Sequence, residues 1–146
     1  WELSEIEFKS EFSINSLIFY AVSKQYGKVI LKILLPNNFD EEIPTLKEIE
    51  GFNLMWEDNF DTFNRDDWNV ELHDPGWVNN ELQAYVDSEE NIFVEDGKLV
   101  LQALKTDAGY TSGRVNTQNK HDYKYGRFEA RAKVPSGQGF LPAFWM

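Results

Sequence analysis

The sequence predicts an all-β fold, a sandwich or barrel built from short strands. From residue 52 onward, extended runs follow one another and are separated by turn-forming residues. The dipeptide Asp96-Gly97 lies between the runs at 91–95 and 98–104, a pattern typical of a two-residue hairpin. Residues 125–134 alternate between apolar and charged side chains, as a half-buried strand does. No helical periodicity lasts longer than about two turns.

The chain before residue 51 differs in composition and pattern from the chain after it. Three extended runs precede it, at 6–8, 17–22 and 28–35. Residues 25–27 lie between the second and third runs, where a hairpin connection would be placed. The acidic, proline-marked stretch 36–50 reads as a linker. We therefore expect 1–35 to be the tail of a preceding β-rich module, or an N-terminal extension.

The remaining strands follow in order along 51–146. They are expected at 52–60, 68–72, 91–95, 98–104, 111–117 and 125–134. A further strand begins at 139, with Pro142 making it irregular or edge-like. Burial of apolar side chains such as Leu99 and Leu101, worth ~1.5–3 kcal/mol each, is the main driving force for folding.

Charge and composition exclude several classes of function. The 146 residues carry a net charge of −11, which repels phosphate backbones, so a nucleic acid is not expected as a partner. No apolar run reaches the ~18 residues of a membrane span, and nothing at the front resembles a signal peptide. Both ends look like cuts through ordered structure. Cysteine is absent, which excludes disulfides, thiolate metal sites and a cysteine nucleophile in this stretch.

The aromatic content is high, at 15% with five Trp. One interpretation is a large aromatic core. The other is a sugar-binding surface, because sugar rings stack their C–H faces on indole and phenol planes. An acidic chain suits a neutral ligand of this kind.

Six sequence blocks in a fixed order carry a family resemblance. They are WEDNF at 56–60, GWVNNELQAY at 76–85, EDGKLV at 95–100, TSGR at 111–114, KYGRFEAR at 124–131, and PSGQG at 135–139 running on through PAFWM at 142–146. In this order they resemble the laminarinases of glycoside hydrolase family 16. Each block alone is weakly specific, but the ordered set is specific and covers 51–146 almost without interruption.

The resemblance implies a concanavalin A-like jelly-roll sandwich of two bent antiparallel sheets, whose concave face holds a glucan chain. It also implies retaining hydrolysis of β-1,3 bonds in laminarin-like or mixed-linkage glucans by a secreted or cell-surface enzyme. The family's catalytic Glu-x-Asp-x-x-Glu strand follows the PAFWM block after a loop. Residues 51–146 are then the N-terminal part of the domain, and this stretch alone is expected to be inactive and to pair with the missing C-terminal half.

Five residues match substrate-binding positions of the family. Asn79 and Asn80 lie where an amide hydrogen-bonds glucosyl hydroxyls, although Asn-Asn also commonly builds a turn. Arg114 matches a cleft arginine, with a surface salt bridge as the alternative. Trp145 matches a tryptophan on which a sugar ring stacks in the family, with core burial as the alternative. Trp77 is a further candidate for lining the same groove.

No residue in the sequence is assigned a catalytic role. Retaining glycosidases need two carboxyls ~5–5.5 Å apart. On a strand, i and i+2 share a face, and the candidates are Asp87 with Glu89 and Glu57 with Asn59. The first pair reads as a solvated loop, and the second lacks its second acid.

The sequence gives little indication of a metal or cofactor. His73 and His121 lack the spacing of metal ligands, and no cofactor is required. By resemblance, Gly97 matches a position of a structural calcium site, so calcium is a possible ligand. A departure from the family pattern is Leu141, where relatives commonly have Trp, and this casts doubt on the neighbouring sugar subsite.

Two alternatives to a β-1,3-glucanase share these residues. One is a non-catalytic β-glucan recognition protein on the same fold. The other is a relative that cleaves a galactan, such as agarose or carrageenan, against which the blocks at 76–85 and 111–114 argue.

Overall fold

The computed structural model describes residues 9–22, 30–34, 51–135 and 138–146, and it describes side chains from residue 51 onward. These residues form strands and no helix, which confirms the all-β prediction. The strands are β1 (Lys9–Val22), β2 (Ile30–Leu34), β3 (Phe52–Asp58), β4 (Asn69–Val70), β5 (Gln83–Tyr85), β6 (Ile92–Glu95), β7 (Lys98–Thr106), β8 (Gly109–Ser112), β9 (Val115–Asn116) and β10 (Arg127–Lys133). Within this part of the chain, no helix has the length and apolar character to cross a bilayer.

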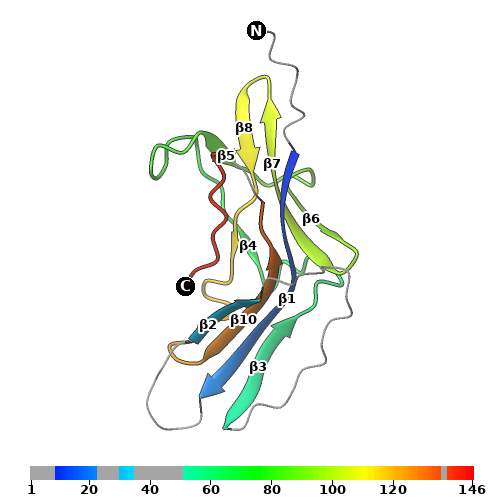
Figure 1. Ribbon diagram of the computed structural model, residues 1–146, viewed down its shortest axis with the longest axis vertical. Coiled ribbons are helices and arrows are strands. Elements are labelled where there is room, and N and C mark those ends of the chain that lie inside the picture. Colours follow the sequence, from blue (N-terminus) through cyan, green and yellow to red (C-terminus); the bar gives the residue numbers. More distant parts are fainter. Residues whose placement is uncertain (1–8, 23–29, 35–50, 136–137) are drawn as a thin grey trace.

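Eight of these strands belong to one long, curled sheet (Figure 1). Its path runs β2-β10-β1-β7-β8-β5, with β3 paired to β1 and β6 paired to β7. The β7–β8 hairpin lies at one end of the molecule, and β2 and β3 lie at the other (Figure 1). The curled all-strand sheet agrees with the jelly-roll sandwich that the resemblance implies.

β1 holds the two ends of this sheet together. Its first half pairs antiparallel with β7 and its second half with β3, while β10 pairs along its other edge. A strand from the segment before residue 36 therefore shares a sheet with strands from 51–146. The division of the chain into 1–35, 36–50 and 51–146 remains a prediction.

The hairpin expected between the runs at 17–22 and 28–35 is wrong as a pairing. β10 lies between β1 and β2, and it pairs with β2 in parallel. Ladder hydrogen bonds to β10 thus replace those that a hairpin would have made between β1 and β2. The proposed turn at 25–27 lies outside the described residues.

The predicted hairpin at Asp96-Gly97 is confirmed. β6 and β7 pair antiparallel up to Glu95 and Lys98, and the two turn residues have φ of 51° and 66°. Two consecutive positive φ values are the mark of the turn type whose twist fits a hairpin. β7 carries Leu99, Val100 and Gln102 into buried positions, so both of its faces are covered.

The core gathers between this hairpin, β10 and the Trp68 region. Its buried members are Phe60, Trp68, Ile92, Leu99, Phe128, Ala130 and Ala132. The alternation predicted for 125–134 is confirmed in part. Phe128, Ala130 and Ala132 are buried on one face of β10, but Val134 is 39% exposed and Arg131, on the other face, is also buried. Trp56 packs edge-on against Trp68, with ring centroids 5.7 Å apart.

The strand expected from residue 139 is wrong. Residues 138–146 run as irregular chain, and Pro142 cannot donate a ladder hydrogen bond. Phe144 nevertheless packs against the core. The segment is therefore anchored by side-chain contacts, which leaves its neighbours Leu141 and Trp145 exposed, at 77% and 64%.

Candidate functional site

A short two-stranded ribbon positions the first two residues of the site. β4 pairs antiparallel with β9, and the ladder continues one step further, where the Glu71 N–H donates to the Arg114 carbonyl at 2.9 Å. The side chains of the same two residues also meet, because Arg114 Nε donates to Glu71 Oε2 at 2.8 Å. Arg114 and Glu71 are 19% and 18% exposed, so the ion pair is half-buried.

Glu71 accepts from two further side chains. Asn116 Nδ2 donates to Glu71 Oε1 at 2.9 Å, and His73 Nε2 lies 3.0 Å from Oε2. Burial alone would raise the pKa of Glu71, but the hydrogen bonds from Asn116, His73 and Arg114 outweigh it and lower the pKa. Burial likewise works to lower the pKa of Arg114, and the hydrogen bond and charge of Glu71, with a smaller contribution from Tyr85, raise it overall.

Three aromatic rings surround the Arg114 guanidinium. Its Cζ lies 5.3 Å from the ring centroid of Trp77, 5.5 Å from that of Tyr85 and 5.2 Å from that of Trp145. These distances fall within the range of cation–π attraction. We call this set the Arg114 cluster: Glu71, His73, Trp77, Tyr85, Arg114, Asn116 and Trp145.

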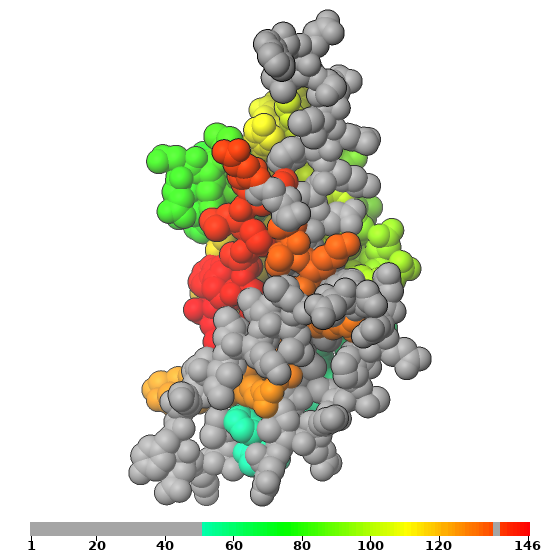
Figure 2. Space-filling model, viewed as in Figure 1, coloured from blue at the N-terminus to red at the C-terminus, as the bar shows by residue number. Residues whose placement is uncertain are grey.

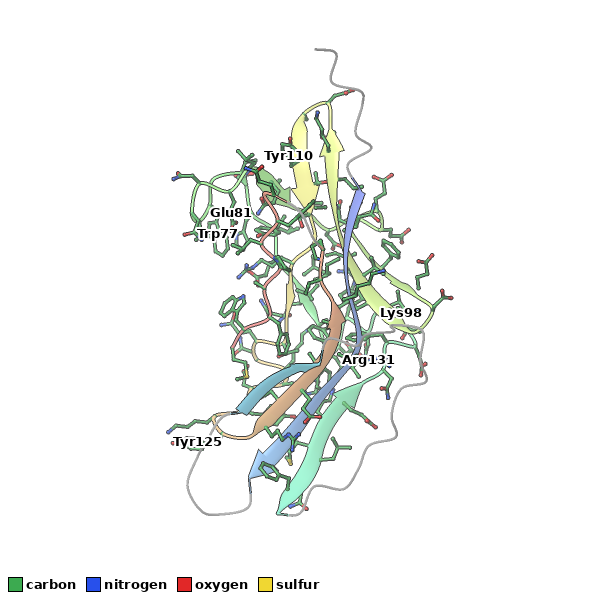
Figure 3. All side chains as sticks on the ribbon, in the orientation of Figure 1. Trp77, Glu81, Lys98, Tyr110, Tyr125 and Arg131 are labelled. Carbon is green, nitrogen blue, oxygen red and sulfur yellow. The ribbon has the colours of Figure 1, made fainter. Side chains whose placement is uncertain are left out.

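The cluster joins segments that are far apart in sequence. In Figure 2 the green segment, which contains Trp77, and the red C-terminal segment lie next to each other on the visible face. Figure 3 shows Trp77 and Glu81 in the loop before β5, on the opposite side of the view from Lys98 in the β6–β7 hairpin. Trp77 is 46% exposed and Trp145 is 64% exposed, so both indoles present ring surface to solvent.

His73 and Tyr85 connect this loop to the sheet. Their backbones exchange two hydrogen bonds, from His73 N to Tyr85 O at 3.1 Å and from Tyr85 N to His73 O at 2.9 Å. The His73 ring lies parallel to the Trp77 ring, with centroids 3.4 Å apart and an interplanar angle of 3°. The Tyr85 hydroxyl donates to Glu81 Oε2 at 3.2 Å and accepts from Gln83 Nε2 at 2.9 Å.

Three of the five predicted site residues therefore come together: Trp77, Arg114 and Trp145. The high exposure of Trp145 separates it from the buried core. Arg114 does form a salt bridge, through Nε, but the side chains of both partners are less than one-fifth exposed, so it is not the surface salt bridge of the alternative.

Asn79 and Asn80 occupy the tip of the loop that carries Trp77. Both have φ of 53°, and Glu81 N donates back to Val78 O at 3.0 Å, so the two amides form the centre of a tight turn. Both side chains are exposed. Turn formation is thus observed, and contact with sugar hydroxyls stays a prediction.

Calcium at Gly97 also stays a prediction. Apart from Gly97 and its chain neighbours, the heavy atom nearest to a Cβ placed at this glycine is the backbone carbonyl oxygen of Asn59, at 3.8 Å. Among the described residues, no group of three or more His, Cys, Asp or Glu side chains could hold a metal ion. The expectation therefore still depends on the family resemblance.

The acidic pairs considered in the sequence have other roles or neighbours. Asp87 forms a two-point ion pair with Arg65, at 2.9 and 2.7 Å, which leaves it as a surface partner of that arginine. In the second pair, Asn59 is exposed. Neither pair lies in the Arg114 cluster.

Sequence reasoning missed Glu71, His73, Tyr85 and Asn116. A signal for the first two was present, because residues at i and i+2 of an extended run share a face. Nothing local indicated that this face would meet Arg114, which lies 43 positions later.

Comparisons with known proteins identify relatives of this chain. Residues 78–146 match the family described as glycosyl hydrolases family 16. A "Glucan endo-1,3-beta-glucosidase A1" of Niallia circulans is 42% identical over 123 residues, which cover 70% of this chain and 18% of that protein. A "Glucan endo-1,3-beta-glucosidase" of Cryptopygus antarcticus is 45% identical over 103 residues, covering 64% of this chain and 37% of that protein.

A more distant relative is named as a binding protein and not as a hydrolase. A "Beta-1,3-glucan-binding protein" of Penaeus monodon is 26% identical over 136 residues, covering 64% of this chain and 37% of that protein. The chain thus spans well under half the length of these curated relatives. No solved structure matches it.

Proposed function

Because this chain belongs to glycosyl hydrolase family 16, we propose that the full-length protein hydrolyses β-1,3-glucosidic bonds in laminarin-like or mixed-linkage β-glucans with retention of configuration. The observation that carries the proposal is the Arg114 cluster. Three sequence blocks far apart in the chain bring two exposed indoles to one guanidinium. The names of the relatives suggest a β-glucan as the substrate, and the Arg114 cluster offers a surface whose chemistry suits binding it.

The chemistry of the cluster suits a neutral sugar chain. Indole faces are apolar and rigid, so they can stack on the C–H faces of glucosyl rings at low entropic cost. Arg114 uses Nε for Glu71, and its terminal amino groups carry further N–H donors for hydroxyls. Since the positive charge of Arg114 balances the negative charge of Glu71, this ion pair has little net charge. A surface of this kind suits a neutral ligand.

The two carboxyls of the retaining reaction are proposed to lie outside the described residues, on the strand that the family places after the PAFWM block. One acts as nucleophile and the other as acid/base, ~5–5.5 Å apart. The contribution of this chain is to bind and orient the glucan so that the scissile bond meets those groups.

The test is hydrolysis by the full-length protein. We expect reducing sugar to be released from laminarin and lichenan but not from agarose, and proton NMR to show the β-anomer as the first product. Release from agarose alone, or an α-anomer as first product, would contradict the proposal.

A non-catalytic β-glucan-binding protein is the second candidate, favoured by the similarity to the Penaeus monodon protein. Every residue of the Arg114 cluster in this chain would serve either candidate function. Sedimentation of the full-length protein with insoluble β-1,3-glucan, without release of reducing sugar, would select this alternative.

We also propose that the full-length protein is secreted or held at the cell surface, because polymeric glucans are met outside the cell. The net charge of −11 makes nucleic acid a poor partner. Cell fractionation of a tagged full-length protein tests the location, and recovery in the cytosol alone would contradict it.

A further inference from the structure

We propose that Glu71 and His73 are positioning residues, which hold the Arg114 guanidinium and the Trp77 indole in one fixed arrangement on the glucan-binding surface. The inference depends on the proposed function for its ligand. Its geometry, however, is independent of that ligand and can be measured without it.

Glu71 is the centre of the arrangement, because both of its carboxylate oxygens are in use. Oε2 accepts from Arg114 Nε at 2.8 Å and lies 3.0 Å from His73 Nε2, while Oε1 accepts from Asn116 Nδ2 at 2.9 Å. Asn116 is fixed in turn, since its Oδ1 accepts from Asn69 Nδ2 at 3.0 Å across the β4–β9 ribbon. Charge-assisted hydrogen bonds of this length are about twice as strong as neutral ones.

This contact limits how Arg114 can move. The Glu71 and Arg114 backbones are joined by a 2.9 Å hydrogen bond, and their side chains by the Nε contact, so the Arg114 side chain is restrained both at its backbone and at its guanidinium. A long, flexible side chain otherwise loses substantial entropy when it binds a ligand. The contact with Glu71 therefore orders the Arg114 side chain before the sugar binds, so that less side-chain entropy is lost on binding.

His73 extends the same restraint to Trp77. One ring nitrogen faces Glu71, and the ring plane lies 3° from that of Trp77 at a centroid distance of 3.4 Å. The His73 backbone is itself tied to Tyr85 by two hydrogen bonds. Trp77 sits in a loop closed by short turns, so His73 and Arg114 are its contacts with the end of the ribbon.

A positioning role fits Glu71 better than a proton-transfer role. A general acid at neutral pH needs a raised pKa, whereas the hydrogen bonds around Glu71 outweigh its burial and lower its pKa. Its oxygens are also occupied by three side chains of the same protein. The carboxylate thus remains ionised and acts through Arg114 and His73.

The experiment compares three variants of the full-length protein. E71Q keeps the shape of the side chain but removes its charge. H73F keeps a flat ring against Trp77 but loses the hydrogen bond to Glu71, and H73Q keeps a donor but loses the flat ring. We expect E71Q to raise the Kd for laminarihexaose and the KM for laminarin about tenfold, with kcat within about twofold. H73F and H73Q should each raise Kd about threefold, since H73F removes the contact with Glu71 and H73Q removes the stack on Trp77.

A second readout requires no sugar. The Arg114 Nε–H proton should give a protected NMR resonance at neutral pH, assigned by its absence in R114K. In E71Q this resonance should shift and exchange faster with water. If the wild-type protein shows the resonance but binds no glucan, the positioning geometry stands and the proposed function fails.

A matched control lies elsewhere in the chain. His121 also pairs with a carboxylate and stacks on an indole, at 2.6 Å from Asp67 Oδ1 and with ring centroids 4.4 Å from Trp56. H121Q should lower the melting temperature and leave Kd within about twofold. The inference is overturned if E71Q leaves both Kd and the Arg114 resonance unchanged, or if E71Q lowers kcat while KM stays constant.

Discussion

At the scale of single residues, two histidine–carboxylate pairs hold irregular segments to the ribbon and the core. Glu71 pairs with His73, and Asp67 pairs with His121, each with side chains less than one-third exposed. The pKa of Asp67 is lowered mainly by the hydrogen bond from His121, against an opposing effect of burial. Both acids therefore prefer to be ionised in the folded state.

This preference predicts a loss of stability in acid. A carboxyl whose folded pKa is lowered contributes stability that is fully present above its unfolded pKa and is lost as the pH falls through the folded pKa. Urea unfolding of the full-length protein from ~pH 7 down to ~pH 2 should show the free energy of unfolding falling over this window. D67N should flatten the curve, because it removes the contribution of Asp67. Parallel curves for wild type and D67N would contradict the assignment.

Asn91 gives a second residue-scale prediction. It is 2% exposed, and its Nδ2 donates to Gln102 O at 2.8 Å and to Thr111 Oγ1 at 3.1 Å. Asn91→Ala leaves a buried carbonyl without its donor, so it should lower the free energy of unfolding by about 1–3 kcal/mol. The exposed Gln118→Ala serves as the control and should change it by less than about 0.5 kcal/mol. Equal effects of the two substitutions in urea unfolding would contradict this prediction.

At the scale of elements, patterns with local causes were predictable. The Asp96-Gly97 turn and the apolar face of β10 depend on neighbours within a few residues. The turn is confirmed, and Phe128, Ala130 and Ala132 of that face are buried. β5 was missed because its three residues pair in parallel with β8, a partner that no local pattern reveals. The position of β2 beside β10 is non-local for the same reason.

The β6–β7 turn provides the prediction at this scale. Gly97 has φ of 66°, a value that costs a residue with a Cβ roughly 1–2 kcal/mol. Gly97→Val should therefore lower the free energy of unfolding by about that amount, or more because Val is β-branched. Asp96→Asn should be nearly neutral, since Asn tolerates the left-handed region. Thermal melts of the two variants check the prediction, which fails if both melt at the wild-type temperature.

At the scale of the whole molecule, the curled sheet brings the site together. The loop before β5, the residue just before β9 and the C-terminal segment contribute Trp77, Arg114 and Trp145. The sequence pointed to these three because each stands in a block that resembles the family. It could not point to the residues that hold them, because Glu71 meets Arg114 only after β4 and β9 have paired.

The strongest claim at this scale is that Trp77 and Trp145 belong to one glucan-binding surface. Oxidation of the full-length protein by N-bromosuccinimide, with mass-spectrometric readout of each tryptophan, tests it directly. Laminarihexaose should protect Trp77 and Trp145 together, while maltohexaose protects neither. Equal oxidation of both indoles with and without laminarihexaose would contradict the claim.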